Sequence, residues 1–105
     1  MAWIYLVAAG VLEIVWAFAM KQSDGFTRIV PASVTLVAMA GSVGLLALAM
    51  RSLPLGTAYT IWTGIGAVGA FVVGIILLGE AMTLSRILSV SLIVIGLIGL
   101  KLSTP

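Results

Sequence analysis

The sequence has no cysteine and no histidine among its 105 residues. The lack of cysteine excludes disulfides, thiol chemistry and cysteine-ligated metal sites. The lack of histidine removes the side chain most used for proton transfer near neutral pH, which is also the commonest metal ligand. We therefore expect no metal and no cofactor. An enzyme is disfavoured as well, because no nucleophile–base pair accompanies the one ionisable group that lies inside an apolar segment.

Charge is scarce too. The chain has five Lys+Arg and three Asp+Glu residues, 8% of the total, whereas a soluble domain carries about a quarter charged residues. Hydrophobic residues make up 63%. A soluble chain of this size needs polar residues to cover its surface, so the expected solvent is a lipid bilayer. The lack of a basic patch excludes nucleic-acid binding.

Four apolar stretches are long enough to span a bilayer, which takes about 20 mainly apolar residues in a helix. The connections between them are short, so consecutive helices are expected to be antiparallel neighbours in one all-α domain, residues 1–105. Ala17-Phe18-Ala19 resembles a signal-peptidase site, but Glu13 interrupts the preceding apolar run and no basic residue comes before it, so we expect no cleavage. The predicted helices cover residues 2–20, 29–50, 57–78 and 84–102.

The cations are balanced between the two sides of this layout. Lys21, Arg28 and Arg86 fall on one side, and Arg51, Lys101 and the terminal amine fall on the other. Because orientation follows the Lys/Arg excess near the membrane, there is almost no bias. We favour insertion in both orientations, which would allow an antiparallel homodimer; the alternative is that one side prevails weakly.

Small residues provide surfaces for a second copy, which four short helices need because they cannot easily surround a polar passage alone. Gly66, Ala70 and Gly74 recur every fourth residue in the third span and would let helix backbones approach closely. Gly96 and Gly99 interrupt the large aliphatic residues of the fourth span and predict a dimer contact. For both sets, packing within one chain is the alternative.

Glu13 is the most informative residue. It lies about 11 residues into the first span, roughly 17 Å deep, near the middle of the bilayer. A carboxylate there is expensive, at least ~2.5 kcal/mol for a comparable Asp, and no basic side chain within the spans could pair with it. An intramembrane carboxylate indicates function; the alternative is a protonated structural carboxyl that is hydrogen-bonded to a neighbouring helix.

The predicted surroundings of this carboxylate suit an organic cation. One turn away are Gly10, which leaves room, and Trp16, which offers an aromatic face. The third span presents Tyr59 and Trp62 on one face, and Ser42 adds a hydroxyl from the second span. A cation is attracted by the charge and by the ring faces, whereas Mg²⁺ and Ca²⁺ require several oxygen ligands. For the aromatic pair of the third span, an interfacial belt is the alternative.

A proton and an organic cation would compete for Glu13, and this competition is enough to couple their fluxes. Guanidinium fits such a site because it is planar, weakly hydrated and matched to bidentate contacts with a carboxylate. These physical arguments alone do not separate guanidinium from other small cations.

The whole sequence resembles the small multidrug resistance family. The resemblance rests on Glu13, on Ser42 and on the run PLGTAYTIWTGIG over residues 54–66. Two further features resemble the guanidinium-exporter subtype rather than the multidrug subtype. They are Trp16, three residues after the glutamate, and Gly99-Leu100-Lys101 at the end of the last span.

This resemblance implies an antiparallel homodimer in a bacterial inner membrane. It implies exchange of protons for guanidinium, guanylurea or biguanides at a site lined by Tyr59 and Trp62. It also implies that Gly64 and Gly66 bend their helix and that Lys101 has a structural role near the interface, for which a snorkelling end charge is the alternative. Two other functions remain open: a broad exporter of quaternary-ammonium and aromatic cations, and a non-transporting membrane regulatory protein.

Overall fold

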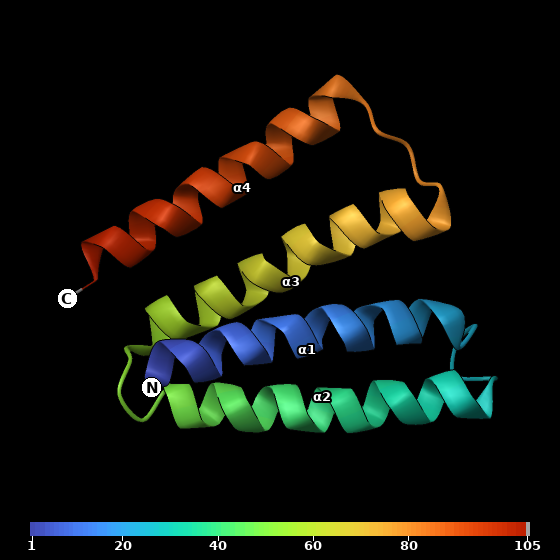
Figure 1. Ribbon diagram of the computed structural model, residues 1–105, viewed down its shortest axis with the longest axis horizontal. Helices are drawn as coiled ribbons and strands as arrows, with labels where there is room; N and C mark the ends of the chain where they lie inside the picture. The colour runs from blue at the N-terminus through green and yellow to red at the C-terminus, as the bar shows by residue number, and fades with distance from the viewer. Residues whose placement is uncertain (105) are drawn as a thin grey trace.

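The computed structural model describes residues 1–104, so the last residue of the expected domain 1–105 lies outside the described residues. The chain forms four helices, and each is long and apolar enough to cross a membrane. This confirms the expected all-α class with four spans. The helices are α1 (Ala2–Gln22), α2 (Ile29–Ala49), α3 (Leu55–Leu78) and α4 (Leu84–Ser103) (Figure 1).

The helix ends follow from local chemistry. The α1–α2 turn takes three consecutive left-handed residues, Asp24, Gly25 and Phe26, with φ of 50°, 71° and 68°. At the start of α3, Pro54 is the N-cap and lies in an extended conformation, so the helix begins earlier than the predicted residue 57. At its end, Gly79 has φ of 67°, a left-handed conformation that glycine adopts readily.

The helices form a flat layer rather than a closed bundle. In Figure 1, α1 lies between α2 and α3, and α4 lies beside α3 and diverges from it toward the α3–α4 turn. The Cα atoms extend over 42 × 34 × 16 Å, and one helix with its side chains is about 10–12 Å across. A layer this thin does not enclose a passage within one chain.

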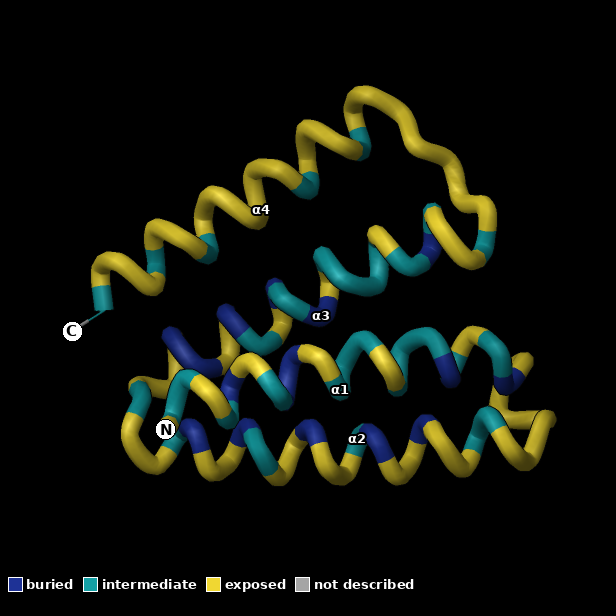
Figure 2. The backbone as a smooth tube through the Cα atoms, in the orientation of Figure 1, coloured by how far each residue is buried: buried dark blue, intermediate teal, exposed yellow. Residues whose placement is uncertain are grey.

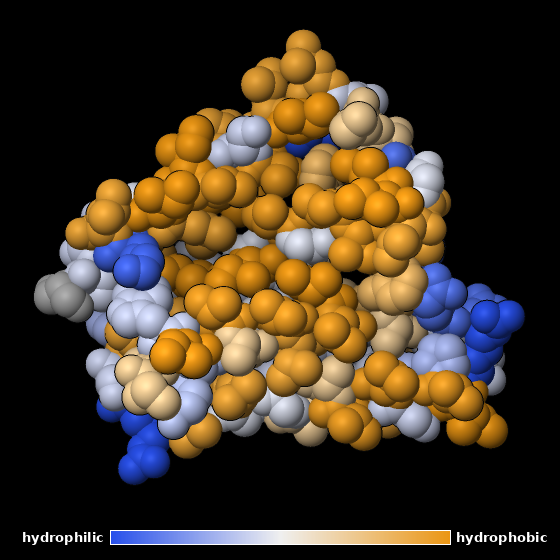
Figure 3. Space-filling model, in the orientation of Figure 1, coloured by the Kyte–Doolittle hydropathy of each residue, from blue (hydrophilic) through white to orange (hydrophobic). Residues whose placement is uncertain are grey.

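Burial is concentrated where α1, α2 and α3 meet (Figure 2), and the face that Figure 3 shows is mostly apolar. Among the described residues of α4, none is buried. Around Gly96 and Gly99 of that helix there is open space where a side chain would be. The core cluster consists of Leu6, Ala9, Leu46, Ala49, Ala58 and Ile61.

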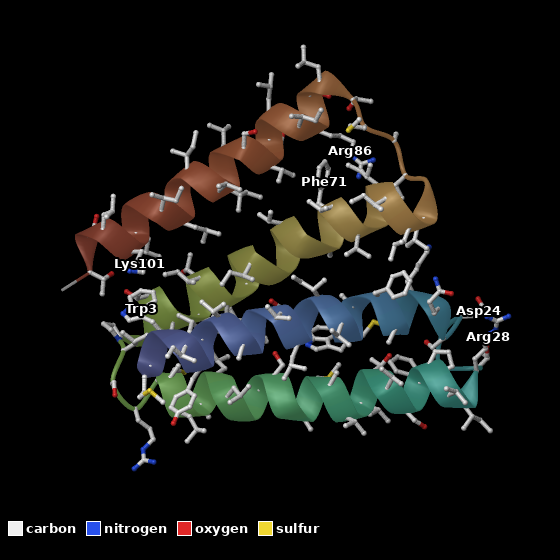
Figure 4. The ribbon with its side chains drawn as sticks, in the orientation of Figure 1. Trp3, Asp24, Arg28, Phe71, Arg86 and Lys101 are labelled. Atoms are coloured by element: carbon white, nitrogen blue, oxygen red, sulfur yellow. The ribbon has the colours of Figure 1, made fainter. Side chains whose placement is uncertain are left out.

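On the face that Figure 3 shows, hydrophilic residues gather mainly toward the ends of the layer, whereas Glu13 lies midway along α1. Figure 4 shows Arg28 and Arg86 at the end that holds the α1–α2 and α3–α4 turns, whereas Lys101 lies at the opposite end. This is the distribution that the sequence predicts for alternating spans. Insertion in both orientations stays a prediction.

Candidate functional site

Glu13 of α1 packs against α3. Its carboxyl group lies directly on the backbone of Gly66, so a Cβ at that glycine would overlap the Glu13 side chain. The Oε1 atom is shielded from solvent and has no hydrogen-bond partner within residues 1–104. The Gly66 backbone N–H faces the same carboxyl group, so a structural carboxyl bonded to α3 stays the alternative. Among the described side chains, none donates a hydrogen bond to Oε1.

Trp16 carries the second unpaired group. Its indole Nε1 is also buried and has no acceptor in the described part of the chain. Leaving such a group unpaired costs about 1–3 kcal/mol. An indole N–H only donates, as does a guanidinium group, so these two cannot hydrogen-bond to each other. The Trp16 ring can attract a cation with its face, while its N–H suits a carboxylate oxygen.

Ser42 of α2 contacts the α1 backbone at Ala9, four residues before Glu13. Its side chain is fully buried, and its Oγ donates to the Ala9 carbonyl at 2.6 Å and accepts from Trp62 Nε1 at 2.9 Å. In an α-helix the N–H of residue 13 bonds to the carbonyl of residue 9, so Ser42 holds the turn that carries Glu13. Ser42 therefore positions the site through the α1 backbone, and the described contacts include no hydrogen bond from its hydroxyl to the carboxylate.

Tyr59 and Trp62 of α3 lie close together, but their side chains face different surroundings. The rings of Tyr59 and Trp62 lie 5.4 Å apart between centroids and are tilted by 57°. Trp62 packs on the core, whereas Tyr59 is 53% exposed. Tyr59 lines an open groove of about 620 Å³ between α3 and α4, with Gly64, Gly96 and Leu97 among its other walls. Trp62 is thus linked to the Glu13 turn through Ser42, and Tyr59 faces the groove.

The glycines expected at the site allow close packing. A Cβ at Gly10 would come within 2.6 Å of Ile65 Cγ2, and a Cβ at Gly64 would overlap Leu97. These glycines let α1 and α4 approach α3 closely. α3 is continuous through this segment, so a bend at Gly64 and Gly66 stays a prediction.

Lys101 connects the end of α4 to the start of α1. Its Nζ lies 4.8 Å from the centroid of the Trp3 ring (Figure 4), within the range of a cation–π contact. This contact supports a structural role within the chain, while the expected role near a dimer interface stays a prediction. Among the residues described, no cluster of three or more acidic side chains could hold a metal ion.

The chain is similar to known proteins along its full length. A family model described as Small Multidrug Resistance protein matches residues 1–93. The guanidinium exporter of Yersinia pestis is 62% identical over 104 residues, which cover 99% of this chain and 100% of that protein. The guanidinium exporters of Escherichia coli (strain K12) and Salmonella typhimurium are 59% and 58% identical, with 99% of both chains covered in each case.

Proposed function

This chain belongs to the small multidrug resistance family and is a multi-pass membrane protein, and on that premise we propose that it exports guanidinium and small substituted guanidinium cations in exchange for protons. Relatives that are 58–62% identical over nearly the whole chain carry the name guanidinium exporter. The observation that carries the proposal is the carboxyl group of Glu13 midway along an apolar helix, where no described side chain donates a hydrogen bond to its Oε1.

Coupling follows from the need to neutralise this carboxylate. An uncompensated charge in the membrane interior is costly, so the state in which Glu13 is ionised and empty is disfavoured. Either a proton or a cation removes that cost, and one carboxylate cannot hold both. Export then proceeds by alternation between a protonated and a cation-bound Glu13, which exchanges the two across the membrane.

Guanidinium matches the groups at this site. Its N–H donors fit a carboxylate in bidentate geometry, and its flat face suits the ring of Trp16. The Trp16 N–H does not compete for the cation, because it donates only. It is free to donate to a carboxylate oxygen and so to fix the orientation of the acceptor.

The working unit in this proposal is an antiparallel homodimer in the bacterial inner membrane. A flat layer encloses no passage beside Glu13 within one chain, and α4 has no buried residue among those described. The open space at Gly96 and Gly99 supports α4 as the contact between copies, since small residues favour helix association in membranes. The second copy would supply the missing wall and a second Glu13.

We expect Ser42→Ala to weaken guanidinium binding about tenfold, because it leaves the buried Trp62 N–H unpaired and frees the turn that carries Glu13. Calorimetric titration of the purified dimer with guanidinium measures this. Ser91→Ala is the matched control, since that hydroxyl bonds to the Ile87 carbonyl of its own exposed helix at 2.8 Å. If Ser42→Ala instead dissociates the dimer, Ser42 has a structural role and not a positioning one.

The proposed function is tested by guanidinium uptake into proteoliposomes with an acidic lumen. Protons leaving through the native chain should drive guanidinium inward above its equilibrium level. If the folded dimer ignores guanidinium but accumulates bulky quaternary-ammonium cations, the broad multidrug function replaces this proposal. If it moves neither guanidinium nor the bulky cations, the non-transporting regulatory function replaces this proposal.

A further inference from the structure

A second carboxylate repeats the placement of Glu13 two turns further along α3. Glu80 follows the left-handed Gly79, which folds the chain back so that the Glu80 N–H donates to the Gly74 carbonyl at 3.1 Å. The Glu80 carboxylate then lies against Gly74, where a Cβ would overlap it, as Glu13 lies against Gly66. Eight residues of helix span about 12 Å. The two carboxylates therefore contact one row of small residues at different depths.

Arg86 already places a guanidinium group at this second carboxylate. Its Nη2 lies 4.0 Å from Glu80 Oε1, and its Cζ lies 5.1 Å from the centroid of the Phe71 ring (Figure 4). A carboxylate and an aromatic face are the two elements that the Glu13 site offers a guanidinium ion. The guanidinium group of Arg86 therefore occupies a position beside Glu80 and Phe71 whose chemistry also suits the proposed substrate.

The pair is accessible from outside. A cavity of about 300 Å³ lies between α1 and α3 and is lined by Phe18, Lys21, Ala70, Phe71, Gly74 and Glu80, among others. A second cavity of about 300 Å³ on the α4 side is lined by Phe71, Ser85, Arg86, Ser89 and Val90. A small cation can therefore approach Glu80 and the Phe71 ring from the α1 side, opposite the cavity that Arg86 lines.

The electrostatics at Glu80 favour exchange of a bound cation over tight binding of that cation. The side chains of Arg86 and Glu80 are 39% and 42% exposed, and an ion pair this exposed contributes little. Lys21 lines the same cavity, so a second positive charge lies near the approach to Glu80. An incoming cation can displace Arg86 from this weak pair without leaving Glu80 unpaired, and the like charge of Lys21 disfavours tight retention of that cation.

We propose that Glu80 and Phe71 form a second, superficial guanidinium site, at which an incoming cation replaces the Arg86 side chain on its way to or from Glu13. The ligand class is guanidinium and its small substituted derivatives. This inference rests on the proposed function. The small residues Gly66, Ala70 and Gly74 line the surface of α3 between the two carboxylates. In an antiparallel dimer, each membrane face would carry one such site.

The test uses two variants that this proposal drives in opposite directions. In initial-rate uptake at varied guanidinium concentration, Glu80→Gln should raise KM about threefold, the scale of a half-exposed charge contact. Arg86→Gln should lower KM by a similar factor, because it removes the resident competitor. A purely structural ion pair predicts that both variants act in the same direction, and that outcome overturns the proposal.

Asp24→Asn is the matched control, since Asp24 is an exposed carboxylate at the same end of the layer (Figure 4). It should leave KM unchanged. If Asp24→Asn and Glu80→Gln raise KM equally, the effect is general attraction of cations to the surface and no site exists at Glu80.

A binding experiment separates this inference from the proposed function. In a Glu13→Gln background, titration with guanidinium should shift the NMR resonances of the Phe71 ring, more strongly with Arg86→Gln added and not at all with Glu80→Gln added. This holds whether or not the native chain transports guanidinium. If the Phe71 resonances do not move in any background, the superficial site is refuted, while uptake by the native chain still decides the proposed function.

Discussion

Glu13→Gln is expected to lower gradient-driven guanidinium uptake by about a hundredfold or more, because breaking a buried charge pair costs about 3–5 kcal/mol. The amide has nearly the shape of the carboxyl, so the packing on Gly66 can persist. It can neither bind a proton at ordinary pH nor pair with a cation. Both halves of the proposed exchange are lost together. Uptake into proteoliposomes with an acidic lumen measures this.

The control for this variant is the loss of a carboxylate elsewhere. Asp24 lies in the α1–α2 turn and is exposed, so Asp24→Asn should keep the native rate. Both variants must elute as the native dimer for the comparison to hold. Uptake by Glu13→Gln at the native rate would show that the carboxylate in the middle of α1 is structural.

Gly66→Ala is expected to weaken guanidinium binding about tenfold or more while the fold is kept. The added Cβ would overlap the Glu13 carboxyl group and its Cγ. Because that side chain is flexible, it can move away without disrupting the helix contact, and alanine favours helix more than glycine does. The carboxylate would then leave the position at which it meets its ligand. Calorimetric titration gives the affinity, and circular dichroism reports the helix content.

Gly44→Ala is the matched control for this change. Gly44 lies in α2 with nothing within 4 Å of an added Cβ. The same substitution there should leave both affinity and helix content unchanged. Native affinity in Gly66→Ala would contradict the placement of Glu13 against α3.

The number of helices and the importance of Glu13 could be predicted from the sequence for simple reasons. Each span is mainly apolar and long enough for a bilayer, although α3 begins at Leu55 and not at the predicted residue 57. Glu13 stands out because a carboxylate so deep in an apolar segment has no cation to pair with. These signals depend on composition and position along the chain, which need no tertiary structure.

The arrangement of the helices could not be predicted in this way. Spans that are apolar on all sides carry no contrast to show which face is inward, so the central place of α1 and the flatness of the layer were not accessible. The hydroxyl of Ser42 was noticed, but its bond to the Ala9 carbonyl depends on how α2 meets α1. The close contacts that Gly64 and Gly66 permit were not predicted, and the bend expected there stays a prediction.

The contact of Glu80 with Arg86 was missed for a related reason. The two residues are separated by a non-helical turn, so the spacing rules for helical neighbours do not apply. Gly79 lies in that turn with a left-handed φ, and Gly74 belonged to the predicted small-residue row. Only the structure shows that the turn lays a carboxylate on that row and a guanidinium over Phe71.

The central claim, that protons and guanidinium exchange through one carboxylate, is tested most directly by measuring proton movement driven by a guanidinium gradient. Vesicles containing the native chain and a pH-sensitive dye, with the membrane potential clamped, receive external guanidinium. Exchange predicts that the lumen becomes alkaline as guanidinium enters, and that it does not in Glu13→Gln. Entry of guanidinium without any change in luminal pH would contradict the account.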